Sequence, residues 1–115
     1  MNLLRTALSG SDKFRLSDEN DVAYDLGGND VMSGFYGDDA LRGGSGHDTI
    51  RGHQCKDKLY GEAGDDKLDG GLDADNLYAG SDCDILTGGT GKDKLYGGTD
   101  AGADVFDFNS PPTAA

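Results

Sequence analysis

Aspartate recurs every nine residues along most of this chain, and the period constrains the fold more than any other feature. The series runs through Asp12, Asp21, Asp30, Asp39, Asp48, Asp57, Asp66, Asp75, Asp84 and Asp93, and Asp104 continues it after a two-residue insertion near Asp100 and Ala101. Self-similarity at a fixed period is typical of repeat architectures, in which each unit packs mainly on its neighbours. The sequence therefore predicts stacked units rather than one central core.

Each nine-residue unit has a glycine-rich part and an apolar part, and we number its positions so that the periodic aspartate is position six. Position eight is apolar throughout: Phe14, Ala23, Met32, Leu41, Ile50, Leu59, Leu68, Leu77, Leu86, Leu95 and Phe106. Position four is usually glycine, and paired glycines often occupy positions one and two. Because glycine accepts positive φ, the first part predicts a turn. The last three residues predict a very short strand with one side chain inward.

Composition indicates that something other than apolar burial must stabilise this chain. Only 35% of the 115 residues are hydrophobic, Trp is absent, and the net charge is -12. Such a chain buries too little apolar surface to offset its conformational entropy, so we expect bound cations to compensate. The acidity argues against nucleic acid and anionic membranes as partners. No segment of the sequence is long enough for a membrane span. We expect a monomer.

Two units carry the clearest motif, Gly43–Arg51 (GGSGHDTIR) and Gly88–Tyr96 (GGTGKDKLY). They match G-G-x-G-x-D-x-U-x, where U is a large apolar residue, so the chain resembles the repeat-in-toxin (RTX) family from about Ala7 to Phe108. The resemblance implies an all-β, right-handed parallel β-roll, a β-solenoid with two nonapeptide units per coil. We divide the chain into degenerate N-terminal repeats that form a cap (1–24), the calcium-binding roll (25–108) and a short tail (109–115).

Stacking of coils would place turns eighteen residues apart above one another and align their aspartates in two columns. Aligned carboxylates repel, and calcium is the cation whose flexible shell of oxygen ligands suits carboxylates and main-chain carbonyls. The resemblance implies several Ca²⁺ ions between stacked turns, with carbonyls and one carboxylate oxygen from each turn. The implied ligands are Asp30, Asp39, Asp48, Asp57, Asp66, Asp75, Asp84, Asp93, Asp104, Gly44, Gly46, Gly64, Gly71, Asp73, Asp82, Gly89 and Gly91.

Several turns depart from the motif. Glu19, Cys55, Asp73 and Asp82 replace the glycine at position four, where a Cβ is costly. The turn before Asp57 also has His53 at position two, so we expect the sites that include Asp57 to be the weakest central ones. His53 and Cys55 could instead suggest zinc, but a structural zinc site needs two further ligands. The two cysteines are expected on opposite edges of the roll, as free thiols.

One outer face carries a column of aromatic and basic residues at position nine, namely Tyr24, Arg42, Tyr60, Tyr78 and Tyr96. Two interpretations stay open for this column: cross-strand pairing that stabilises an exposed sheet, or a ligand face formed by Arg42, Tyr60, Tyr78 and Tyr96.

The functional prediction follows from the resemblance. It implies a calcium-binding module that folds on binding Ca²⁺ and stabilises a secreted, extracellular bacterial protein exported by type I secretion. The alternative is a module that binds an anionic, alginate-like polysaccharide within an extracellular carbohydrate-active enzyme. The sequence has no nucleophile with a plausible base, so the module is expected to be non-catalytic, although its parent protein could be an enzyme.

Overall fold

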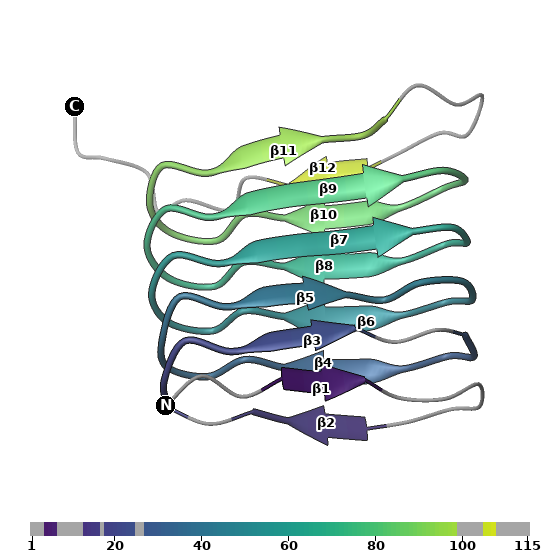
Figure 1. Ribbon diagram of the computed structural model, residues 1–115. Coiled ribbons are helices and arrows are strands. Elements are labelled where there is room, and N and C mark those ends of the chain that lie inside the picture. Colours follow the sequence, from purple (N-terminus) through teal and green to yellow (C-terminus); the bar gives the residue numbers. More distant parts are fainter. Residues whose placement is uncertain (1–3, 7–12, 17, 25–26, 99–104, 108–115) are drawn as a thin grey trace, which may run out of the picture.

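The residues that the structure describes form twelve short strands arranged as two parallel sheets. The computed structural model describes residues 4–6, 13–16, 18–24, 27–98 and 105–107. Figure 1 shows the strands as a stack of coils joined by turns at two edges. The strands are β1 (Leu4–Thr6), β2 (Lys13–Arg15), β3 (Val22–Tyr24), β4 (Val31–Ser33), β5 (Ala40–Arg42), β6 (Thr49–Arg51), β7 (Lys58–Glu62), β8 (Lys67–Asp69), β9 (Asn76–Gly80), β10 (Ile85–Thr87), β11 (Lys94–Tyr96) and β12 (Val105–Asp107).

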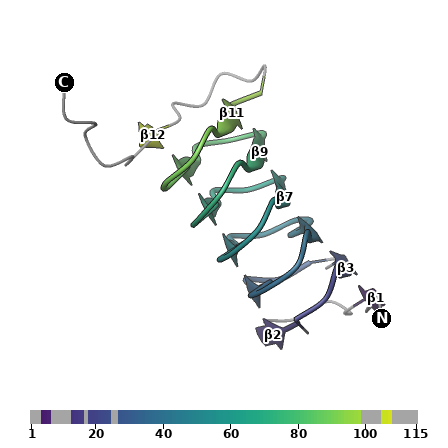
Figure 2. The same ribbon diagram turned by 90° about the vertical axis from the view of Figure 1, so that its left-hand side faces the viewer.

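Successive strands alternate between the two sheets, so each coil contributes one strand to each. The first sheet has the order β1-β3-β5-β7-β9-β11 and the second β12-β10-β8-β6-β4-β2, with all pairs parallel. Lys58 pairs with Asn76, eighteen residues later. The coil is right-handed (Figures 1 and 2). The predicted all-β, right-handed parallel roll with two units per coil is confirmed.

The register also locates the predicted insertion. Ile85 of β10 pairs with Val105 of β12, an offset of twenty residues instead of eighteen. The two extra residues therefore enter between β11 and β12, while the parallel pairing of the second sheet continues past them. The sheet tolerates this insertion because pairing constrains the strands and leaves the length of the connection free.

The sequence did not anticipate β1. Leu4 pairs with Val22 and Thr6 with Tyr24, at the ordinary offset of eighteen residues. The strand has no periodic aspartate, since Leu3 stands two residues before its middle residue. Parallel pairing thus extends the first sheet one strand beyond the aspartate series. The role of residues 1–24 as a cap stays a prediction.

The apolar core is a thin layer between the sheets, formed mainly by position eight. Each of these strands points its middle residue inward: Ala23, Met32, Leu41, Ile50, Leu59, Leu68, Leu77 and Leu86 are at most 1% exposed. Leu95 is partly buried against them. The residues on either side of each inward residue are half-buried or exposed. Apolar burial is therefore limited to about one side chain per unit, as the composition required. No helix that could span a membrane occurs among the described residues.

Candidate calcium sites

The periodic aspartates form two buried columns, one at each edge of the roll. We call them the Asp57 edge (Asp21, Asp39, Asp57, Asp75 and Asp93) and the Asp66 edge (Asp30, Asp48, Asp66 and Asp84). Both predicted columns are confirmed within the described residues, whereas Asp12 and Asp104 lie outside them. All but Asp93 are at most 2% exposed. Asp21, which the predicted ligand set omitted, occupies the same buried position, and its place in the nine-residue series was the available signal.

Hydrogen bonds connect each column from turn to turn. The N–H of Asp39 donates to Oδ1 of Asp57 at 2.9 Å, and the N–H of Asp57 donates to Oδ1 of Asp75 at 2.8 Å. On the Asp66 edge, Asp48 donates to Asp66 in the same way at 2.7 Å. One carboxylate oxygen per aspartate therefore fixes the distance between successive turns.

The second carboxylate oxygen indicates a cation. Within the described residues, the Oδ2 atoms of five aspartates are buried and lack a hydrogen-bond partner: Asp39, Asp57, Asp66, Asp75 and Asp93. A buried carboxylate oxygen without a donor costs free energy unless a cation or a proton compensates it. A column of such oxygens in successive turns fits a row of hard cations.

The raised pKa values of these carboxyls support the same conclusion. Burial, with repulsion from neighbouring aspartates, raises the pKa of Asp39 to about 7 and that of Asp57 to about 9, although backbone N–H donors oppose the shift. The same causes raise the pKa of Asp66 and of Asp75 to about 8. The folded roll therefore disfavours bare carboxylates at neutral pH, and a bound cation would remove that penalty.

Position-one glycines make room for these carboxylates. A methyl group at Gly43 or Gly52 would overlap the carboxylate of Asp48 or Asp57, respectively. A Cβ at Gly61 would lie 2.6 Å from Oδ2 of Asp66. The repeat pattern predicted a role for glycine in turn conformation alone, and this steric role was not predicted.

Positive φ occurs at positions two and four of the turns. All eight predicted main-chain ligands have it, with φ of 82° at Gly44, 108° at Gly46, 105° at Gly64, 91° at Gly71, 70° at Asp73, 75° at Asp82, 84° at Gly89 and 108° at Gly91. The carbonyls of Gly44 and Gly71 also accept hydrogen bonds from the next turn, at 3.1 and 2.9 Å. Each carbonyl keeps a second lone pair for a cation.

The oxygens available to a metal ion therefore come from both carboxylates and main-chain carbonyls. Within the described parts of the chain, no three His, Cys, Asp or Glu side chains cluster in a way that could hold a metal ion. A site between two turns does not require such a cluster, because each turn would contribute one carboxylate oxygen and main-chain carbonyls. This all-oxygen set suits calcium and gives no support to zinc at His53 and Cys55.

Side chains at positions four and five form further hydrogen bonds between turns, which were not predicted from the sequence. Oδ1 of Asn20 accepts the N–H of Asp38 at 2.7 Å, and Oδ1 of Asp38 accepts the N–H of Lys56 at 3.0 Å. Oδ2 of Asp73 accepts the N–H of Cys55 at 2.9 Å. Polar side chains at positions four and five were the signal for these contacts.

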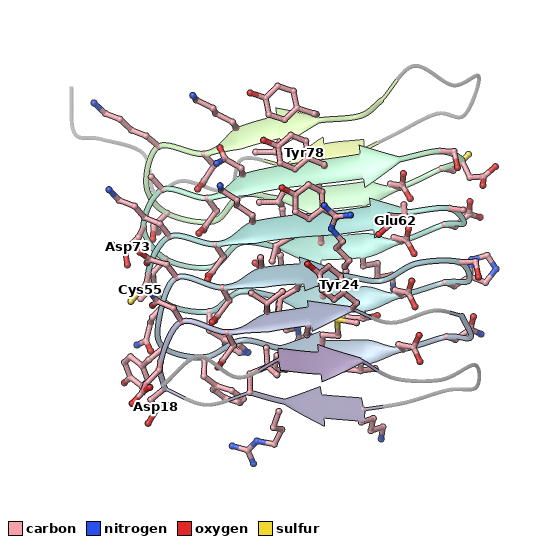
Figure 3. The ribbon with its side chains drawn as sticks, in the orientation of Figure 1. Asp18, Tyr24, Cys55, Glu62, Asp73 and Tyr78 are labelled. Atoms are coloured by element: carbon pink, nitrogen blue, oxygen red, sulfur yellow. The ribbon has the colours of Figure 1, made fainter. Side chains whose placement is uncertain are left out.

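The cysteines confirm the geometry of the coil. Cys55 belongs to the turn that enters β7 and Cys83 to the turn that enters β10, at opposite edges, and neither of the two is in a disulfide. Figure 3 shows Cys55 near Asp73 at one edge and Glu62 toward the other.

The tyrosine column is formed as predicted. Ring centroids lie 4.8 Å apart for Tyr60 and Tyr78 and 4.9 Å apart for Tyr78 and Tyr96, with nearly parallel planes. The Arg42 guanidinium lies 4.7 Å from the Tyr60 centroid and 5.6 Å from that of Tyr24. Because the rings cover one another's faces, a sugar could reach mainly their edges. This geometry favours cross-strand pairing, and polysaccharide binding stays a prediction.

The family comparison agrees with this geometry. The family model for the RTX calcium-binding nonapeptide repeat (four copies) matches residues 6–34, 16–50, 33–68, 56–86 and 78–110. Neither the search of curated proteins nor that of solved structures gave a match. The matched ranges together span residues 6–110 and include both aspartate columns, so the chain belongs to the RTX calcium-binding nonapeptide repeat family.

Proposed function

We propose that this chain is a non-catalytic module that folds when it binds calcium and thereby stabilises a secreted bacterial protein. The observation that carries the proposal is the set of buried Oδ2 atoms without a hydrogen-bond donor, aligned in successive turns. Stacking these carboxylates without a cation disfavours the folded state, whereas a calcium ion bound between turns would stabilise it. The free energy of metal binding then becomes free energy of folding.

Each ion would lie between turns eighteen residues apart at one edge. On the Asp66 edge, the turns of Asp48 and Asp66 would each supply a carboxylate oxygen, with carbonyls from Gly44, Gly46 and Gly64. The Asp57 edge would use Asp39, Asp57, Asp75 and Asp93 with Gly71, Asp73, Gly89 and Gly91. Asp30, Asp84 and Asp82 would extend the first row, and Asp104 continues it in the sequence. When bound, calcium neutralises the carboxylates, and an interior aspartate can contact two ions.

Circular dichroism tests the proposal directly. The calcium-free chain should be disordered at neutral pH, and millimolar calcium should restore a strand-rich spectrum in a steep transition, because neighbouring sites share ligands. Magnesium at the same concentration is the control and should act weakly, because it demands a tight octahedral site. A strand-rich spectrum that persists after thorough removal of calcium at neutral pH would sink the proposal.

The secretory role rests on the calcium difference between compartments. RTX repeats are typical of secreted bacterial proteins, and a module with affinities of roughly 10⁻⁴ to 10⁻³ M would be unfolded in the cytoplasm and folded outside. An unfolded chain suits export through a type I channel. Calorimetric titration checks the affinity range, and submicromolar binding would contradict this part of the proposal.

A further inference from the structure

A second stack of planar groups lies on the turns of the Asp57 edge. The rings of Phe35 and His53, at position two of successive turns, have centroids 4.7 Å apart and planes 2° from parallel. The guanidinium of Arg15 lies 4.8 Å from the Phe35 centroid. Phe35 thus has planar groups against it from Arg15 and His53, and the family motif assigns no function to this stack.

The stack ends at a pocket. Gly71 occupies position two of the turn that follows His53 by one coil, and a Cβ there would overlap the carbonyl oxygen of His53. Gly71 also has a φ of 91°, so a side chain is disfavoured on two grounds. A shallow pocket of about 250 Å³ lies here, lined by Phe35, His53, Gln54, Gly71 and Leu72. Leu72 is 46% exposed and supplies an apolar wall, while Gln54 supplies a polar group.

The other stack in this molecule indicates which chemical group can pack on the face of a ring at this spacing. In the tyrosine column, Arg42 stands where a ring would otherwise stand, between Tyr24 and Tyr60. Arg15 covers Phe35 in the same way. A guanidinium therefore substitutes for a ring at strand spacing in both stacks, because it is planar and its charge is attracted to the ring face.

The negative charge of the chain favours a guanidinium in the pocket over a neutral ring or an anion. The chain carries a net charge of -12, and Asp73, in the same turn as Gly71 and Leu72, is exposed. We propose that the pocket between His53 and Gly71 binds an arginine side chain of a partner protein, stacked on the imidazole of His53. The pocket exists only in the folded roll, so the test uses chain whose calcium-loaded fold has been verified by circular dichroism.

The probe is the blocked tripeptide acetyl-Gly-Arg-Gly-amide, titrated into the calcium-loaded chain at pH 8 and observed by NMR. Saturable shifts are expected for the Leu72 methyl groups, the Gln54 side-chain amide and the His53 ring. The lysine tripeptide tests charge without planarity and should bind at least about threefold more weakly. A tyrosine tripeptide tests planarity without charge. An arginine tripeptide that causes no shifts, or lysine or tyrosine tripeptides that bind as tightly, would overturn the proposal.

Two matched variants separate the pocket from the fold. His53→Gly removes the stacking surface, yet it places glycine at a φ of 75°, so the roll should be retained or strengthened. Glu62→Gly relieves the same strain at position two of the opposite edge, where φ is 74°, and leaves the pocket intact. Arginine-dependent shifts of Leu72 should be lost in His53→Gly and kept in Glu62→Gly. Shifts that survive in His53→Gly would show that the imidazole plays no part.

Discussion

Two consecutive turns, one at each edge of the roll, reach the same stacking with different residues. The turn Gly43–Asp48 (GGSGHD) has glycine at both positive-φ positions, with φ of 82° and 108°. The turn Gly52–Asp57 (GHQCKD) has His53 and Cys55 there, both with φ of 75°. Even so, the N–H of Asp48 and that of Asp57 donate to the next aspartate of their columns at 2.7 and 2.8 Å. The column is preserved although the turn backbone differs.

The difference extends along the chain. Described glycines at position four have φ between 101° and 108°, whereas Cys55, Asp73 and Asp82 have 70° to 75°. An L-residue is tolerated near the left-handed helical region, at a φ of about 57°, so these turns shift toward it. Each such residue still costs on the order of 1 to 3 kcal/mol. Four of the six lie on the Asp57 edge, namely Phe35, His53, Cys55 and Asp73. That the sites including Asp57 are the weakest central ones stays a prediction.

Acid should reveal whether the columns at both edges need a cation, and this is the largest effect that we expect. The folded-state pKa values of Asp57, Asp66 and Asp75, about 8 to 9, exceed the ordinary value of 3.8. At a pH between the ordinary value and these raised values, the folded state therefore binds more protons than the unfolded state. The stability of the calcium-free roll thus rises as the pH falls through this range. Chain stripped of calcium on a chelating resin should gain strand signal in circular dichroism from pH 8 to pH 4. A fall in strand signal on acidification would contradict the burial of these carboxyls.

The second prediction compares the two turns by removing the charge of the periodic aspartate from each. Asp48→Asn and Asp57→Asn keep an oxygen that can accept the backbone N–H, but they take a negative charge from the ions. Urea unfolding in saturating calcium should show a loss of about 3 kcal/mol for Asp48→Asn, typical of breaking a buried charge pair. Asp57→Asn should lose less, because its turn already contains two strained residues. Equal losses would show that the substituted turn binds calcium as well as the glycine turn.

A methyl group at position four separates backbone adaptation from glycine dependence. Gly46→Ala places a Cβ at a φ of 108°, where it would overlap the carbonyl oxygen of Gly28. Cys55→Ala changes a residue that already has a Cβ and a φ of 75°. In calcium, Gly46→Ala should lower the free energy of unfolding by about 2 kcal/mol more than Cys55→Ala does. A negligible difference would mean that any turn can shift its φ at little cost.

The nine-residue period, together with the coil of two units that the RTX resemblance implies, was enough to predict strands β2 to β12, both columns and the tyrosine stack. All three depend on main-chain periodicity, which places side chains of one position in line once coils stack. The period could not predict β1, whose pairing with β3 depends on a neighbour eighteen residues away and on no motif residue. Nor could it predict the shift of φ at Cys55 and Asp73, since this reflects a compromise between stacking and local strain.

Features that depend on side-chain conformation were also missed. The bond from Cys55 N–H to Asp73 requires one rotamer of an exposed carboxylate. The contact of Arg15 with Phe35 joins a strand residue at position nine of the repeat to a turn residue at position two. Periodicity compares like positions, so it does not bring such residues together. The steric role of position-one glycines similarly appears only once the carboxylates are placed.

Restoring glycine to the substituted turn should have the smallest effect, and unlike the substitutions above it should raise the free energy of unfolding. Cys55→Gly releases a residue with a φ of 75°, and the N–H that donates to Oδ2 of Asp73 is retained. Relief of strain in the folded chain exceeds the added flexibility of glycine in the unfolded chain, so we expect a gain of about 1 kcal/mol. Urea unfolding in calcium provides the measurement. Cys83→Gly is the control, because Cys83 is at position five of its turn and its φ is not positive. If Cys55→Gly destabilises the chain as much as Cys83→Gly does, the two turns carry no difference in strain, and the weakness expected of the sites that include Asp57 must have another cause.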